Sequence, residues 1–94
     1  MQGNLNITIP KEFSVEAAAD FRLKINDYIN DGVINFTFNF SDCEFIDSTG
    51  LGVMVSIYKK CAERNGILKL ISLKPEVKKL FKLTRLDRVF DIEW

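Results

Sequence analysis

The chain has 94 residues, of which 47% are hydrophobic, and it carries 13 basic and 13 acidic side chains. That length suits one small domain with a modest core, and we expect a single domain over residues 1–94. Because the sequence contains no histidine, it excludes Ser-His-Asp and Cys-His catalytic sites and argues against a typical zinc site.

The first half of the chain predicts two strands that flank a helix. Leu5–Ile9 alternates apolar and polar residues and stops at Pro10, which is typical of a strand. Ser14 is a suitable N-cap for the segment that follows, whose apolar positions recur at helical steps: Ala18, Phe21, Ile25 and Ile29. After a stop at Asn30–Gly32, Val33–Phe40 alternates again, so we expect a strand with one apolar face.

The second half continues the alternation of strands and helices. A short strand is expected at Phe45–Ile46, and a helix from Ser48 to about Asn65, where "NG" caps its end. The stretch "ILKLISL" predicts a strand. Pro75 opens a further helix, which places apolar residues and a threonine on one side: Val77, Leu80, Phe81 and Thr84. The tail "DRVFDIEW" is expected to be extended.

This order of elements predicts the class of fold. Strands separated by helices are joined by parallel crossovers, which gives a mixed or parallel sheet with helices packed on it. Functional loops in such folds cluster at the carboxyl ends of the strands. The stretch Asp47–Gly52 lies at such a place, where a strand end opens into a helix.

The sequence also carries signals about compartment and reactivity. It has no run of about 18 apolar residues that would cross a membrane. Nor does it open with the basic and then apolar pattern of a secretory signal, so we expect a cytoplasmic protein without a membrane association. Cys43 and Cys61 are too few for a disulfide framework and are expected to be free, partly buried thiols.

The charges of the chain are unevenly distributed. Eight acidic and three basic side chains give residues 1–47 a net charge of −5, and ten basic and five acidic side chains give residues 48–94 a net charge of +5. Such a pattern affects partner choice more than fold. The basic residues around Lys74–Arg85 are interpreted as a solvated helix face, not a nucleic-acid site. The carboxylates of Asp42, Glu44 and Asp47 are interpreted as surface turn acids, and we expect no metal and no cofactor.

The cluster Asp47–Gly50 is the most informative local feature. The first turn of a helix has unpaired backbone N–H groups and a partial positive charge, which attract anions. Asp47 or Ser48 can accept a hydrogen bond from an N–H two or three residues further on. Gly50 and Gly52 leave the backbone open to close approach. Ser48 is therefore expected to be accessible at a positively polarised helix end.

Three interpretations of this cluster compete. It is a plain N-cap before a buried helix, a phosphate-binding loop, or a phosphorylation switch whose hydroxyl is the substrate of a partner kinase. The phosphate-binding loop of nucleotide-binding proteins needs a lysine in the pattern G-x-x-x-x-G-K-[ST], and no such lysine is present. The cap and the switch both remain open on these residues alone.

The segment "FIDSTGLGVMVSIYKKCAERNG" resembles the signature of STAS domains, and of bacterial anti-sigma factor antagonists in particular. A second similar segment, "KPEVKKLFKLTRLDRVF", follows the next strand, so the resemblance covers roughly residues 33–92. It implies a STAS fold of the α/β class, with a mixed β-sheet of four to five strands and three or more α-helices packed mainly on one side. Residues 5–32 match by element order and length.

The resemblance also implies a function. Such proteins, when unphosphorylated, bind an anti-sigma factor that is also a serine kinase of the GHKL ATPase type, and a sigma factor is released. The kinase phosphorylates the serine after the aspartate, here Ser48, with Thr49 as the secondary candidate, and binding is lost. A phosphatase of the PP2C type restores the protein. The chain would then be a binding module and not an enzyme, as a monomer or weak dimer.

Several residues are expected to contact the partner. Asp47 would orient the Ser48 hydroxyl and help cap the helix, and Gly50 would allow close approach of the kinase or would serve turn geometry alone. On the helix that follows, Leu51, Met54, Val55 and Tyr58 are expected to face the sheet. Val53, Ser56 and Ile57 would lie on the more exposed side, where apolar residues would either bind the partner or be buried against a neighbouring helix.

One stretch departs from the family pattern. Many antagonists carry G-x-[LIV]-D before the first helix, whereas this chain has "KEFS", Lys11 to Ser14. That departure keeps open an alternative, a STAS scaffold or regulatory subunit of a signalling complex or transporter without phosphorylation. A small enzyme or nucleotide-binding domain is the other alternative, and the missing histidine and missing P-loop lysine argue against it.

Overall fold

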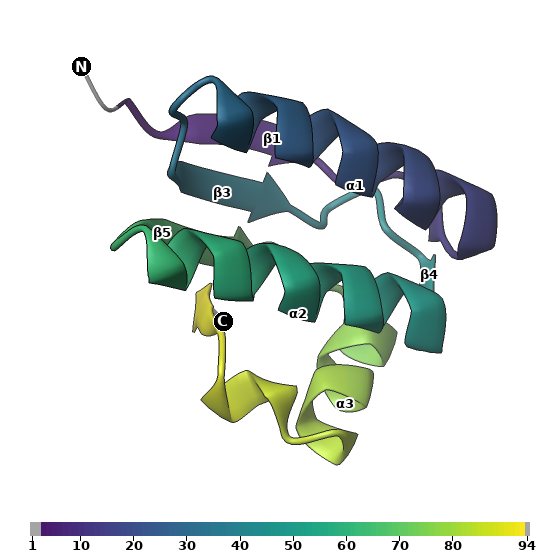
Figure 1. Ribbon diagram of the computed structural model, residues 1–94. Coiled ribbons are helices and arrows are strands. Elements are labelled where there is room, and N and C mark those ends of the chain that lie inside the picture. The colour runs from purple at the N-terminus through teal and green to yellow at the C-terminus, as the bar shows by residue number, and fades with distance from the viewer. Residues whose placement is uncertain (1–2, 94) are drawn as a thin grey trace.

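The computed structural model describes residues 3–93 and contains two layers (Figure 1). Its elements, in chain order, are β1 (Leu5–Thr8), β2 (Glu12–Phe13), α1 (Val15–Asn30), β3 (Asn35–Asn39), β4 (Phe45–Ile46), α2 (Ser48–Glu63), β5 (Ile67–Ile71), α3 (Pro75–Leu83), a 3₁₀ turn η1 (Leu86–Arg88) and β6 (Asp91–Glu93). Helices α1 and α2 lie side by side over one face of the sheet, and α3 follows below them (Figure 1). The predicted α/β class is confirmed, and so is the predicted order of elements apart from β2 and η1.

The main sheet has four strands in the order β1-β3-β5-β6, and all of its pairings are parallel. Of the two forms that the sequence left open, it therefore takes the parallel one. The register places Ile7 beside Phe38 and Phe38 beside Leu70, so apolar side chains share the face that the helices cover. Asn6, Thr37 and Lys69 form the neighbouring row and point to the opposite face.

A second, two-stranded sheet is formed by β2 and β4, which pair in parallel. The strand at Phe45–Ile46 was predicted, but its partner Glu12–Phe13 was not, because two residues carry no periodic signal. This small sheet lies where the chain enters α2, so it positions the Asp47–Gly50 turn.

Helix α1 follows its sequence pattern closely. The four residues predicted to form its apolar face are all buried: Ala18, Phe21, Ile25 and Ile29. Ser14 occupies the N-cap position as expected, and its backbone carbonyl accepts from the N–H of Ala18 at 2.8 Å, although its side chain makes no cap hydrogen bond. At the other end Gly32 has a φ of 97°, a conformation that favours glycine.

The outer-face assignment of α2 is partly wrong. Leu51 and Met54 are buried as predicted, but Val53 and Ile57 are buried as well, with exposed fractions of 9% and 0%. Helix α2 packs against α1 in addition to the sheet, and Lys60 Nζ donates to Asn26 Oδ1 across this helix pair at 2.7 Å. Val53 and Ile57 therefore belong to the core, which agrees with the alternative of burial against a neighbouring helix, and they offer no exposed surface to a partner.

The C-terminal third matches the prediction with two differences. Val77 and Phe81 are buried in α3, but Thr84 is exposed and ends the helix, where its Oγ1 donates to the Leu80 carbonyl at 2.9 Å. The tail is not wholly extended, since it contains η1 before β6 pairs with β5. Trp94 lies outside the described residues.

Replacing Ile57 with alanine tests the corrected face of α2. Because Ile57 is fully buried, Ile57→Ala is expected to lower the free energy of unfolding by about 2–5 kcal/mol. Ser56→Ala, one residue away and partly exposed, is expected to change it by less than about 0.5 kcal/mol. Urea denaturation of both variants measures the difference, and equal stability of the two would place Ile57 on the surface.

Candidate functional site

Asp47 caps helix α2. Its backbone is extended, with φ −110° and ψ −173°, and its Oδ1 accepts from the backbone N–H of Gly50 at 3.0 Å. Its backbone carbonyl accepts from the N–H of Leu51 at 3.0 Å, which starts the helical hydrogen bonds. The predicted cap is thus confirmed, while the role of Asp47 in orienting the Ser48 hydroxyl stays a prediction.

Ser48 and Thr49 are the first two residues of α2, and both are exposed. At these positions the backbone N–H groups have no partner within the helix, and the helix dipole adds a partial positive charge. Two accessible hydroxyl groups therefore lie where a dianionic substituent is best tolerated. Exposure does not separate Ser48 from Thr49.

Gly50 is buried and faces the protein itself. A Cβ at this position would collide with the backbone carbonyl of Phe13 and would lie 2.8 Å from both Ile46 Cγ1 and Phe13 Cδ2. We expected Gly50 to serve either the approach of a kinase or turn geometry alone. In the structure, Phe13 of strand β2 occupies this space. Gly50 is therefore required for the close contact between β2 and the first turn of α2.

Gly52 has the opposite environment. It is exposed, and a Cβ built on it would meet nothing within 4 Å. Glycine inside a helix destabilises it by about 1 kcal/mol relative to alanine. The fold gives no reason for a glycine at this position.

The departing stretch Lys11–Ser14 lies directly beside the site. The carbonyl of Lys11 accepts from the N–H groups of Glu44 at 2.8 Å and Phe45 at 3.2 Å, which fastens β2 to the strand that enters the turn. Phe13 is fully buried and its ring meets that of Phe21 edge-on, with centroids 5.2 Å apart. Periodicity and spacing alone do not indicate that this stretch and the turn are neighbours, because they are more than thirty residues apart, but the resemblance to anti-sigma factor antagonists implies it, and the pairing of β2 with β4 agrees.

The cysteines offer no reactive nucleophile. Cys43 and Cys61 are both free and buried. Burial raises the pKa of both thiols above the usual value, so the thiolate form is disfavoured at neutral pH. Residues 3–93 also contain no group of three or more acidic, cysteine or histidine side chains placed to hold a metal ion. Within the same residues, no helix is long and apolar enough to cross a membrane.

Comparison with known proteins gives consistent matches. The family model of the STAS domain matches residues 1–93. A Thermotoga maritima protein, provisionally named an anti-sigma factor antagonist, is 36% identical over 83 residues, which cover 87% of this chain and 74% of the relative. The anti-sigma-B factor antagonist of Bacillus subtilis is 31% identical over 91 residues, which cover 97% of this chain and 83% of the relative.

Solved structures agree with the sequence matches. A crystal structure of a protein from Thermotoga maritima with the same provisional name superposes with a TM-score of 0.86 at 33% identity, over 93% of this chain and 77% of that one. The anti-sigma factor antagonist SpoIIAA in its unphosphorylated form gives a TM-score of 0.86 at 23% identity, over 100% of this chain and 83% of that one. At that identity the likeness to SpoIIAA shows a shared fold alone.

The two glycines form a matched pair for mutation. Gly50→Ala forces a methyl group against the Phe13 carbonyl and is expected to lower the free energy of unfolding by about 1–3 kcal/mol. Gly52→Ala enters open space and is expected to raise it by about 0.5–1 kcal/mol. Urea denaturation of the two variants checks both signs. Destabilisation by Gly52→Ala would contradict its open environment.

Proposed function

This chain belongs to the STAS domain family, and from that premise we propose that it is a cytoplasmic anti-sigma factor antagonist that is switched by phosphorylation of Ser48. Unphosphorylated, it binds an anti-sigma factor that is also a serine kinase of the GHKL ATPase type, and a sigma factor is released. Phosphorylation ends the binding, and a PP2C-type phosphatase restores it. The names of the relatives from Thermotoga maritima and Bacillus subtilis support the antagonist role.

The exposed Ser48 hydroxyl at the capped N-terminus of α2 is the observation that carries this proposal. A kinase needs an accessible hydroxyl group on its substrate. Here the Asp47 cap and the Gly50–Phe13 contact hold the turn in place from inside the chain. Thr49 is exposed beside it and is the secondary acceptor.

The physical effect of the phosphate favours a local switch. It adds a charge of about −1.5 to −2, which the N-terminus of α2 accommodates, so the fold is retained. At an interface the same charge is buried against the partner, next to the carboxylate of Asp47. By analogy with unpaired buried charges the loss of binding is about 2–5 kcal/mol, or roughly 30-fold to several-thousand-fold in Kd.

No catalytic role is proposed for the chain. General bases and nucleophiles in enzymes are most often histidine, activated cysteine or activated serine. The sequence has no histidine, and both cysteines are buried with raised pKa values. The serine at the turn is therefore assigned as a substrate of another enzyme.

Gly52 extends the proposed contact surface from the turn onto the helix. It lies one turn after Ser48 on α2, it is exposed, and it has no packing partner for a Cβ. Close approach of a partner's backbone to α2 at this point would explain the glycine, which packing within the chain does not explain. The proposed contact surface is thus Asp47, Ser48, Thr49 and Gly52.

Alanine variants of the two hydroxyl residues test the switch. With the anti-sigma factor kinase from the same cells and ATP, Ser48→Ala is expected to abolish phosphorylation while the protein still binds the kinase, and Thr49→Ala is expected to keep phosphorylation. Ser48→Asp is expected to weaken binding at least tenfold, since it places a permanent negative charge on the turn. Calorimetric titration and phosphate incorporation give the readouts. Full phosphorylation of Ser48→Ala would reject Ser48 as the acceptor.

Gly52→Ala separates stability from binding. The variant is expected to be at least as stable as the unaltered chain but to bind the kinase at least fivefold more weakly, because the methyl group lies between two closely packed backbones. Asn6→Ala, on the face of the sheet that points away from α2, is the control and is expected to bind normally. Unchanged affinity of Gly52→Ala would remove Gly52 from the contact surface.

A further inference from the structure

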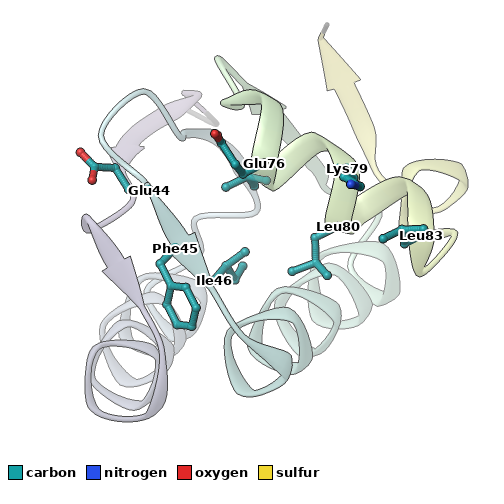
Figure 2. Close-up of a pocket in the computed structure, with 8 residues that line it drawn as sticks. Glu44, Phe45, Ile46, Glu76, Lys79, Leu80 and Leu83 are labelled. Carbon is teal, nitrogen blue, oxygen red and sulfur yellow. The ribbon is translucent and has the colours of Figure 1, made fainter.

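A groove separates strand β4 from helix α3, with a volume of about 230 Å³ (Figure 2). We call it the β4–α3 groove. Its residues come from these two elements and the residue before β4: Glu44, Phe45, Ile46, Glu76, Val77, Lys79, Leu80 and Leu83. The volume is about that of one large apolar side chain.

The groove has an apolar floor and two exposed apolar walls. Ile46 and Val77 are buried beneath it, with exposed fractions of 5% and 2%. Phe45 is 52% exposed and Leu83 is 71% exposed, and the two residues stand at opposite sides of the hollow (Figure 2). A single exposed apolar residue is common on a protein surface. Two that converge on one hollow form a site that an apolar group can fill.

The groove is continuous with the proposed phosphorylation site. Phe45 precedes Ser48 by three residues, so their Cα atoms are at most about 11 Å apart. A stable protein interface buries about 800 Å² on each partner, which corresponds to a disc of about 16 Å radius. An interface of ordinary size centred on Ser48 therefore reaches the strand that forms one wall of the groove.

The charged residues of the groove indicate which side chain of the partner would lie next to its apolar group. Glu44 and Glu76 lie toward one end of the groove, whereas Leu83 lies at the other (Figure 2). The same two glutamates also line an adjoining hollow with Lys74 and Pro75. Lys79 also lines the groove and Lys74 the adjoining hollow, so a basic side chain of the partner is favoured only directly beside the exposed carboxylates of Glu44 and Glu76.

We propose that the β4–α3 groove is a docking pocket for the kinase, which places one large apolar side chain between Phe45 and Leu83 and a basic residue near Glu44 and Glu76. This inference rests on the proposed function and deepens it, because it separates recognition of the chain from the chemistry at Ser48. Contacts made equally in the ground state and the transition state lower KM and leave kcat unchanged.

Two exposed leucines provide the test and its control. Leu83→Ala removes a wall of the groove, and Leu23→Ala removes a side chain that is 61% exposed on α1. With the purified kinase that phosphorylates this chain on Ser48, Leu83→Ala is expected to raise the KM for phosphorylation on the order of tenfold, with kcat unchanged. Leu23→Ala is expected to leave both constants unchanged. Thermal unfolding of both variants shows whether the fold is intact.

A charge variant tests the acidic end. Glu44→Gln is expected to raise the KM about threefold at low salt and by less at high salt, because exposed charges are screened. An equal KM for Leu83→Ala and the unaltered chain would overturn the docking pocket, while phosphorylation of Ser48 would still stand. Concentration-dependent self-association that Leu83→Ala abolishes would assign the groove to a second copy and overturn the inference. Absence of any kinase that modifies Ser48 would overturn the proposed function, and the docking pocket with it.

Discussion

The contact between Gly50 and the backbone carbonyl of Phe13 is the constraint on which the site depends. Only a residue without a Cβ fits there, because the carbonyl, Ile46 and the Phe13 ring fill the space that a side chain would take. The contact joins strand β2 to the first turn of α2. Because the inner side of the turn is filled by the chain itself, its hydroxyl residues Ser48 and Thr49 remain on the outside.

This constraint is rigid because aromatic packing supports it. The ring of Phe13 meets Phe21 of α1, and Phe21 meets Phe38 of β3, with centroid distances of 5.2 Å and 5.1 Å and nearly perpendicular rings. The small sheet of β2 and β4 is thereby tied to the main sheet through α1. A phosphate on an exposed, externally directed hydroxyl changes the charge of the surface without acting on this core, which is suited to a switch that alters binding and retains the fold.

Sequence patterns predicted the local structure well where a single periodicity applied. The apolar face of α1 and the junction between β4 and α2 are as expected, since each is encoded by neighbouring residues. The outer face of α2 was predicted wrongly at Val53 and Ile57. That helix is apolar on several sides, and the periodicity of its apolar residues does not indicate that both the sheet and α1 cover it.

The features that sequence alone missed are contacts between distant segments. Strand β2 has two residues, and its partner is more than thirty residues away. The role of Gly50 depends on that same pairing, so the sequence left open the approach of a partner or turn geometry alone, and the structure shows contact with Phe13. Conversely, Gly52 was equally visible in the sequence, and only its empty surroundings in the structure distinguish it from Gly50.

We would first map phosphorylation sites by mass spectrometry on the protein isolated from its native cells, with and without stress. A regulated switch predicts one phosphoryl group on Ser48, in a fraction that changes with the condition. A chain that is unmodified at both Ser48 and Thr49 under every condition would contradict the switch. The Asp47–Gly50 turn would then be a helix cap and contact surface in a STAS scaffold.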